Sequence, residues 1–243
     1  MGLALLVLLG VVTGVVNALA GGGSLLTLPA LIALGLPAAT ANGTNRIAVL
    51  LHSTLGSVRF HQKGVLDLRA ALRVLPITVV GAVVGAWASL QLGETGLRRA
   101  MGVVLLVVLV VLWLKPQDRL RDRDGALPGW IGQLLFLGVG LYGGFIQAGV
   151  GVLLLAAFVV AVDDDLVRAN AAKLVFVCLF TVPALVIFAV QGHIALVPGL
   201  ALAGGAMAGA EIGTRLAIAK GAPLIRWMLT VVVVVAALNL LRG

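Results

Sequence analysis

The chain has 243 residues, of which 61% are hydrophobic and only 11% are charged, and its mean hydropathy is +1.18. This composition excludes an ordinary soluble domain, in which about a quarter of the residues carry charge. The net charge of +8 does not indicate a nucleic-acid-binding protein, because only 5% of the residues are aromatic and the basic residues lie between apolar runs.

The apolar residues form long runs, such as 101–114 and 231–241, that do not alternate with polar residues. A transmembrane barrel would alternate along each strand, whereas unbroken apolar runs cross a bilayer as helices. We therefore expect an all-α polytopic membrane protein. Residues 3–20 could instead be a signal peptide, but they lack a basic n-region and their pattern recurs inside the chain.

A polar linker at 115–128 divides the chain into a first repeat at 1–114 and a second repeat at 129–243. When the second half is shifted back by 128 positions, 28 of the 115 aligned pairs are identical and no gap is needed. Self-similarity at a fixed offset indicates an internal duplication. We therefore expect two homologous halves.

Each half begins with a long apolar segment, 3–35 or 130–162, that a glycine cluster interrupts. As a continuous helix of about 33 residues it would be roughly 50 Å long, too long for one crossing of about 30 Å. It is therefore expected to turn back, either as a re-entrant hairpin or as two helices. Three transmembrane helices follow in each half, near 39–60, 68–92 and 97–114, and near 167–190, 194–219 and 223–241.

Each half then makes an odd net number of crossings, so we expect the two halves to form an inverted repeat. Four basic residues surround the turn near position 64, and the matching turn near position 192 has no Lys or Arg; the four are Arg59, Lys63, Arg69 and Arg73. By the positive-inside rule the first turn and the linker are cytoplasmic, and both termini are outside.

The glycine breaks are the first candidate binding residues. Transporters built as inverted repeats bind substrates near the midplane, where the N-terminal ends of broken helices present N–H groups that suit an anion. The break residues are Asn17, Gly21, Gly22, Gly23 and Ser24 in the first half, and Gln147, Gly149 and Gly151 in the second. Ser24 is expected to be the N-cap of the short helix after the break. The alternative is that these glycines only permit close helix packing.

We favour that packing alternative for the glycines with GxxxG spacing, which are Gly81, Gly85, Gly209 and Gly213. On the second of these helices Glu211 and Arg215 are four residues apart and are expected to form an ion pair.

The next helix in each half opens with polar residues, which are Asn42, Gly43, Thr44, Asn45 and Arg46 in the first half and Asn170 and Lys173 in the second. Such a run is costly in hydrocarbon, so we expect it to face a cavity. Two amides and two cations that converge on one site would bind a small oxyanion, through bidentate contacts of the Arg and the point charge of the Lys. Alternatively, both cations extend to the membrane interface.

No enzyme is expected, because the sequence contains no nucleophile elbow, dinucleotide fingerprint or phosphate-binding loop. His52, His61 and His193 lack the spacing of metal ligands and are expected in helix interfaces or loops. We therefore expect no metal, no cofactor and no coupling to ATP hydrolysis.

The order of these motifs resembles that of the TauE/SafE sulfite exporter family. The residues that carry the resemblance are Gly14, Ala20 to Ser24, Pro29, Gly35 to Pro37 and Ala41 to Asn45, with an echo at Gly143, Ala148 to Gly151 and Asn170. The resemblance covers nearly the whole chain. It implies a multi-pass permease of the bacterial or archaeal cytoplasmic (inner) membrane that exports sulfite or a related sulfur-containing anion without ATP hydrolysis.

The sequence therefore predicts a secondary transporter that exports a small oxyanion, sulfite or an organosulfonate, by alternating access around a midplane site. An anion-selective channel and a non-transporting accessory subunit are the alternatives. The expected partners are the anion and the lipid bilayer, with no nucleic acid, and a homodimer is left open.

Overall fold

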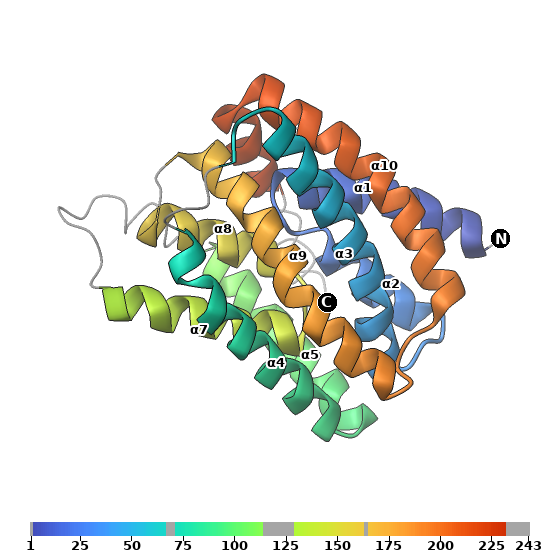
Figure 1. Cartoon of the computed structure of the whole chain (residues 1–243). Coiled ribbons are helices and arrows are strands. Elements are labelled where there is room, and N and C mark those ends of the chain that lie inside the picture. Colours follow the sequence, from blue (N-terminus) through green and yellow to red (C-terminus); the bar gives the residue numbers. More distant parts are fainter. Residues whose placement is uncertain (1, 67–70, 114–128, 163–164, 232–243) are drawn as a thin grey trace.

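The computed structural model describes residues 2–66, 71–113, 129–162 and 165–231, and every regular element within these ranges is a helix (Figure 1). Arg69, the predicted linker at 115–128 and the end of the last predicted helix lie outside the described residues.

The predicted broken segment is present in both halves. In the first half it consists of α1 (Gly2–Leu19) and α2 (Ser24–Ala33), and in the second of α7 (Gly129–Phe145) and α8 (Val150–Ala161). With 10 and 12 residues, α2 and α8 are about 15 and 18 Å long, which is too short to cross a hydrocarbon core of about 30 Å. Each broken segment is therefore one long helix followed by a short returning helix.

The predicted helices after each break are also present. They are α3 (Ala38–Gln62), α4 (Leu75–Gln91) and α5 (Glu94–Trp113) in the first half, and α9 (Leu166–Val190), α10 (Leu196–Lys220) and a helix at Ala222–Val231 in the second. The predicted start of α4 at position 68 is wrong. A short 3-10 turn, η1 (Ala71–Arg73), comes first, and α4 starts at Leu75 because Pro76 fits only the first turn of a helix.

Among the described helices, α1, α9 and α10 are long and apolar enough to cross a membrane by length and composition. The outer surface is apolar as well. Large hydrophobic side chains are more than half exposed on several helices, for example Leu8, Trp130, Val190 and Leu196. Such a surface suits contact with lipid.

Two seams of glycines join helices from different halves of the chain. Along α1 and α10, Gly205 and Gly209 lie against the carbonyl groups of Val7 and Val11. Along α4 and α7, Gly81 and Gly85 lie against the carbonyl groups of Leu137 and Leu141 in the same way. Residue numbers rise together along each seam, so the paired helices are parallel, and Figure 1 shows both pairs side by side. Gly213 packs against Val15 and Ala18 of α1, so the predicted packing role of Gly81, Gly85, Gly209 and Gly213 is confirmed.

The central helices α3 and α9 complete two helix groups. Thr44 lies at the start of α10 and Arg59 contacts Glu211 further along it, so α3 runs parallel to α10. In contrast, α3 and α9 are antiparallel, because Arg46 lies over Phe188 and Gly56 lies beside Leu174. We call α1, α2, α3 and α10 the first bundle, and α4, α7, α8 and α9 the second bundle.

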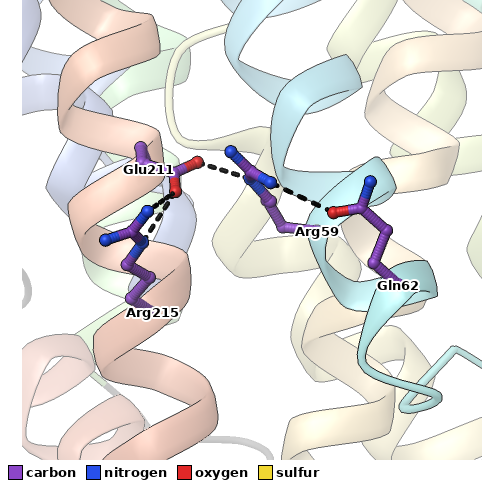
Figure 2. Close-up of polar contacts among 4 residues, drawn as sticks. All are labelled: Arg59, Gln62, Glu211 and Arg215. Carbon is purple, nitrogen blue, oxygen red and sulfur yellow. Dashed lines mark hydrogen bonds and ion pairs between the residues drawn. The ribbon is translucent and has the colours of Figure 1, made fainter.

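An ionic cluster ties α3 to α10 within the first bundle (Figure 2). The predicted pair of Glu211 and Arg215 is confirmed, with a distance of 2.7 Å between Oε1 and Nη2. The other oxygen of Glu211 accepts a hydrogen bond of 2.6 Å from Nε of Arg59, and Nη1 of Arg59 donates to Oε1 of Gln62. The contact from Arg59 was not predicted, because it joins residues 152 positions apart.

The seam between α1 and α10 should respond sharply to an added methyl group. A Cβ at Gly205 would lie 2.0 Å from the carbonyl oxygen of Val7, whereas a Cβ at the neighbouring Gly204 would have no atom within 4 Å. We expect Gly205→Ala to lower the free energy of unfolding by about 1–3 kcal/mol, as overpacking usually does. Gly204→Ala should be neutral or stabilising by up to about 1 kcal/mol, because alanine favours a helix over glycine. Thermal unfolding of both variants in detergent measures the difference, and equal melting temperatures would contradict the seam.

Candidate functional site

The two glycine breaks touch each other at the centre of the molecule. A Cβ at Gly21 would lie 2.4 Å from the carbonyl carbon of Gly151, and a Cβ at Gly151 would lie 2.5 Å from Cα of Gly21. Gly21 also has a φ of +86°, a backbone conformation that residues with a side chain rarely adopt. The two backbone segments that cross at this point therefore both require glycine.

A small buried cavity lies beside this crossing. Its volume is about 10 Å³, room for the centre of about one water molecule. Six of the predicted site residues line it, namely Asn17, Gly21, Ser24, Gln147, Gly151 and Lys173. Its other lining residues are Val49, His52, Ser53, Val150, Leu174 and Val177. An oxyanion is larger than this space, so the lining residues would have to move to admit one.

The N-terminal ends of α2 and α8 border the cavity, through Ser24 and Gly151 respectively. The first turn of a helix leaves backbone N–H groups without intrahelical partners and carries a partial positive charge. Both short helices therefore present the ends that favour an anion.

The expectation that Ser24 caps α2 is wrong. Gly23 is the N-cap residue, Ser24 is the first helical residue, and no side chain makes the usual capping hydrogen bond. Instead, Oδ1 of Asn17 accepts a hydrogen bond of 2.8 Å from the backbone N–H of Gly23. The amide spans the break because α1 ends directly before it, a contact that local capping rules do not consider.

Two side chains of α9 bind the C-terminal end of α1. Nζ of Lys173 donates to the carbonyl oxygen of Asn17 at 3.0 Å and to Oδ1 of Asn170 at 2.6 Å. Nδ2 of Asn170 donates to the carbonyl oxygen of Ala18 at 2.9 Å. Lys173 and Asn170 thus satisfy the carbonyl groups that the end of α1 leaves without partners.

The reciprocal arrangement occurs at the end of α7. The guanidinium of Arg46 in α3 donates to the carbonyl oxygens of Gly143, at 3.2 Å, and Gly144. Nδ2 of Asn42 donates to the carbonyl oxygen of Phe145 at 2.7 Å. The guanidinium also lies over the ring of Phe188, 4.7 Å from its centroid. Each cation therefore comes from one bundle and binds a helix end of the other.

Arg46 and Lys173 are the most unusual charges of the site. Both side chains are buried, with exposed fractions of 0% and 1%, so neither extends to a membrane interface. Among the described residues, neither cation forms a salt bridge with a carboxylate. The carbonyl dipoles compensate only part of a buried charge. Two basic side chains without a carboxylate partner among the described residues therefore lie at the centre of the protein.

Other predicted site residues have contacts away from the cavity. Gly43 packs against His193, where a Cβ would lie 2.1 Å from the carbonyl oxygen, and Oγ1 of Thr44 accepts a hydrogen bond from the N–H of Ala195. Oδ1 of Asn45 accepts a hydrogen bond of 2.6 Å from Thr27.

The remaining break residues have backbone roles. The carbonyl oxygen of Gly22 accepts a hydrogen bond from the N–H of Leu25, within the turn that starts α2. Gly149 has a φ of +71° and is the N-cap residue of α8.

Sequence reasoning missed two polar residues of the cavity. His52 and Ser53 are buried in the middle of α3, and Nε2 of His52 has no hydrogen-bond partner among the described residues. Gln147 donates to Thr181, but its Oε1 likewise lacks a partner in the described part of the chain. In the sequence, His52 lies six residues after Arg46 on the same predicted helix. That position alone does not indicate that His52 shares a cavity with Lys173.

Comparison with known proteins adds an independent observation. A family model described as "Sulfite exporter TauE/SafE" matches residues 6–240. A protein of Escherichia coli (strain K12) described as "Probable membrane transporter protein YfcA" is 29% identical over 240 residues, which cover 98% of this chain and 89% of the relative.

Two other relatives have similar descriptions. "Probable membrane transporter protein ORF9" of Sinorhizobium sp is 27% identical over 98% of this chain and 92% of its own length. A "Probable membrane transporter protein" of Haemophilus influenzae is 27% identical over 94% of this chain and 90% of its own length. No solved structure matches the chain.

The contact between Gly21 and Gly151 can be tested by comparison with Gly64, where glycine is favoured by the backbone conformation alone and not by close packing. Gly64 also has a positive φ, but a Cβ there would have no atom within 4 Å. We expect Gly64→Ala to cost about 1–2 kcal/mol for the left-handed conformation. Gly21→Ala should cost clearly more, because its methyl group also meets the backbone of Gly151. Thermal unfolding of the two purified variants gives the comparison, and equal losses would mean that the breaks are not in tight contact.

Proposed function

Because this chain belongs to the TauE/SafE family and is a multi-pass membrane transporter rather than an enzyme, we propose that it exports a small oxyanion across a bacterial or archaeal inner membrane. The proposed substrate is sulfite or an organosulfonate. The proposed site is the central cavity and the two helix ends beside it.

The observation that carries this proposal is the pair of buried cations, Arg46 and Lys173, which have no carboxylate partner among the described residues. An uncompensated buried charge is costly, and an anion beside it reduces that cost. Lys173 lines the cavity together with the N-terminal ends of α2 and α8, so the cavity offers a point charge and helix N–H groups to one ligand.

The direction of the helices supports an inverted repeat. The matching helices of the two halves are α1 and α7, α3 and α9, and α4 and α10. The first bundle contains α1, α3 and α10, which run in one direction, and α3 is antiparallel to its counterpart α9. In an inverted repeat each helix runs opposite to its counterpart, and the antiparallel pair of α3 and α9 fits that arrangement. On this proposal Arg59, Lys63 and Arg73 face the cytoplasm.

We further propose that the moving bodies in alternating access are the two bundles. The glycine seams fix α10 to α1 and α4 to α7, so each half of the sequence contributes helices to both bundles. The hydrogen bonds from Arg46 and Lys173 instead cross between the bundles. An anion that binds these cations competes with the carbonyl groups and weakens the contact between the bundles.

The membrane potential drives the net transport of an anion out of the cell. When an anion leaves a cell whose interior is negative, its free energy falls by about 2.3 kcal/mol per charge and per 100 mV of membrane potential. A transporter of this kind can therefore export an anion without ATP hydrolysis. An anion channel would use the same driving force, but it would not show accelerated exchange when labelled anion faces unlabelled anion across the membrane.

Sulfite flux into liposomes that contain the purified protein tests the function. We expect saturable flux and counterflow for the wild type. Lys173→Met and Asn42→Ala should each lower the flux at least tenfold, because the first removes the charge in the cavity and the second frees the end of α7. Lys220→Met is the matched control, since Lys220 is an exposed cation in the last turn of α10.

Each outcome has a separate meaning. Flux without saturation or counterflow would identify a channel. Absence of sulfite flux above empty liposomes, with ethanesulfonate also inactive, would contradict the proposed substrates. Equal loss in Lys173→Met and Lys220→Met would place the effect outside the cavity.

The bundle movement can be tested with the single cysteine of the chain. Cys178 in the second bundle lies 3.2 Å from Oγ1 of Thr54 in the first bundle. A cysteine at position 54 is therefore close enough to form a disulfide of about 2.05 Å. We expect oxidation of Thr54→Cys to block sulfite flux and a reductant to restore it. The same variant with Cys178→Ser should be insensitive to oxidant. Full flux through the cross-linked protein would rule out a relative movement of α3 and α9.

A further inference from the structure

The buried histidine of the central cavity has no role in the function proposed so far. His52 is 3% exposed and lines the cavity, and its Nε2 has no hydrogen-bond partner among the described residues. The described residues that line the cavity with it include no carboxylate. A buried polar nitrogen without a partner is costly, so such groups point to a ligand or a change of protonation. Lys173 lines the same cavity from α9.

We propose that His52 is the second residue of the cavity wall, beside Lys173, that can carry a positive charge, and that it takes up a proton when a dianion binds but not when a monoanion binds. This inference rests on the proposed function, because it assumes that the cavity is the anion site. The proton comes from solvent and is held on the imidazole, so no bond other than the N–H bond forms.

Charge balance is the first argument. Lys173 supplies one positive charge to the cavity, which matches a monoanionic sulfonate. A dianion such as sulfite or sulfate leaves one negative charge in a site of low dielectric constant, where it is costly. A protonated His52 brings the summed charge of the ligand and the cavity-lining residues to zero, since Arg46 does not line the cavity and donates to the end of α7. By linkage, a dianion that favours this proton is itself bound more tightly when the proton is present.

The hydrogen bonds of His52 allow both protonation states. Nδ1 lies 3.4 Å from Oγ of Ser53, which is also buried in the cavity wall. A hydroxyl can donate to a neutral imidazole nitrogen or accept from a protonated one by rotating its hydrogen. Nε2 can then present an N–H to the ligand in either state. A change of charge on His52 therefore requires no change of partners.

The titratable groups among the cavity-lining residues are His52 and Lys173, and loss of the proton of Lys173 would weaken the binding of both a monoanion and a dianion. Among the cavity-lining residues, α1 and α2 contribute neutral Asn17 and Ser24, and the break before α8 contributes neutral Gln147. On α10, Glu211 is held by Arg59 and Arg215, and at the start of α5, Glu94 accepts hydrogen bonds from the N–H of Ala38 at the far end of α3. Arg46, on α3 itself, donates to α7.

The test uses two probes that do not titrate near neutral pH, so any pH dependence belongs to the protein. Sulfate is the dianion and ethanesulfonate is the monoanion. Their dissociation constants are measured by calorimetry on the purified full-length protein at about pH 6 and about pH 8, the range in which histidine changes charge. We expect sulfate to bind about tenfold more tightly at the lower pH, within the usual size of such couplings. Ethanesulfonate should change less than about twofold.

The variant His52→Gln should bind sulfate with the same weak affinity at both pH values and bind ethanesulfonate as the wild type does. His61→Gln is the matched control, since His61 is exposed near the end of the same helix, and it should keep the pH dependence. Because the comparison of the two probes is made on the wild type, it decides whether a proton accompanies the dianion even if His52→Gln does not fold.

Other outcomes would overturn the inference. Equal pH dependence for both probes, or a sulfate affinity that does not change with pH, would mean that no proton accompanies the dianion. A pH dependence that survives in folded His52→Gln would assign it to another group. Failure of either probe to bind would also overturn it, whereas the sulfite flux described above tests the transport function separately.

Discussion

The backbone contact between Gly21 and Gly151 determines the architecture of the centre, because it brings four helix ends to one point. The N-terminal ends of α2 and α8 border the cavity there, and the C-terminal ends of α1 and α7 lie on either side. Each kind of end carries a partial charge, positive at the N-terminus and negative at the C-terminus. Lys173 and Arg46 bind the negative ends, so the cavity beside the crossing keeps the positive ones.

The glycine seams determine how the rest of the protein is arranged around that centre. At Gly205 and Gly85 the neighbouring backbone leaves no space for a side chain, so α10 is held against α1 and α4 against α7. Both contacts join different halves of the chain. The helices that follow one another in sequence are consequently divided between two bundles. The contacts between the bundles combine a shared hydrophobic core with hydrogen bonds from polar groups of α3 and α9.

The sequence predicted the helices better than their partners. Length, hydropathy and the glycine clusters gave the breaks at Gly21 and Gly149 and most helix boundaries, since these depend on local properties. The start of α4 was placed too early because the apolar residues before Pro76 resemble a helix. The neighbours of a side chain across the bundle are not local properties. Sequence reasoning therefore missed His52 in the cavity and the contact of Arg59 with Glu211, although it identified Asn170 and Lys173 as polar residues of the centre.

The partners of the buried cations are carbonyl groups, and this affects how easily an anion could replace the hydrogen bonds of Arg46 and Lys173. A carboxylate next to Lys173 would form a strong buried ion pair, and an incoming anion would have to displace a full charge. The carbonyl oxygens of Asn17 and of Gly143 carry only partial charges. A substrate anion interacts more strongly with either cation than a neutral acceptor does, because hydrogen bonds between two ionised groups are the stronger ones. On the proposed function, carbonyl partners of intermediate strength thus keep the cations buried without a ligand, and still allow an anion to take the place of the carbonyl groups.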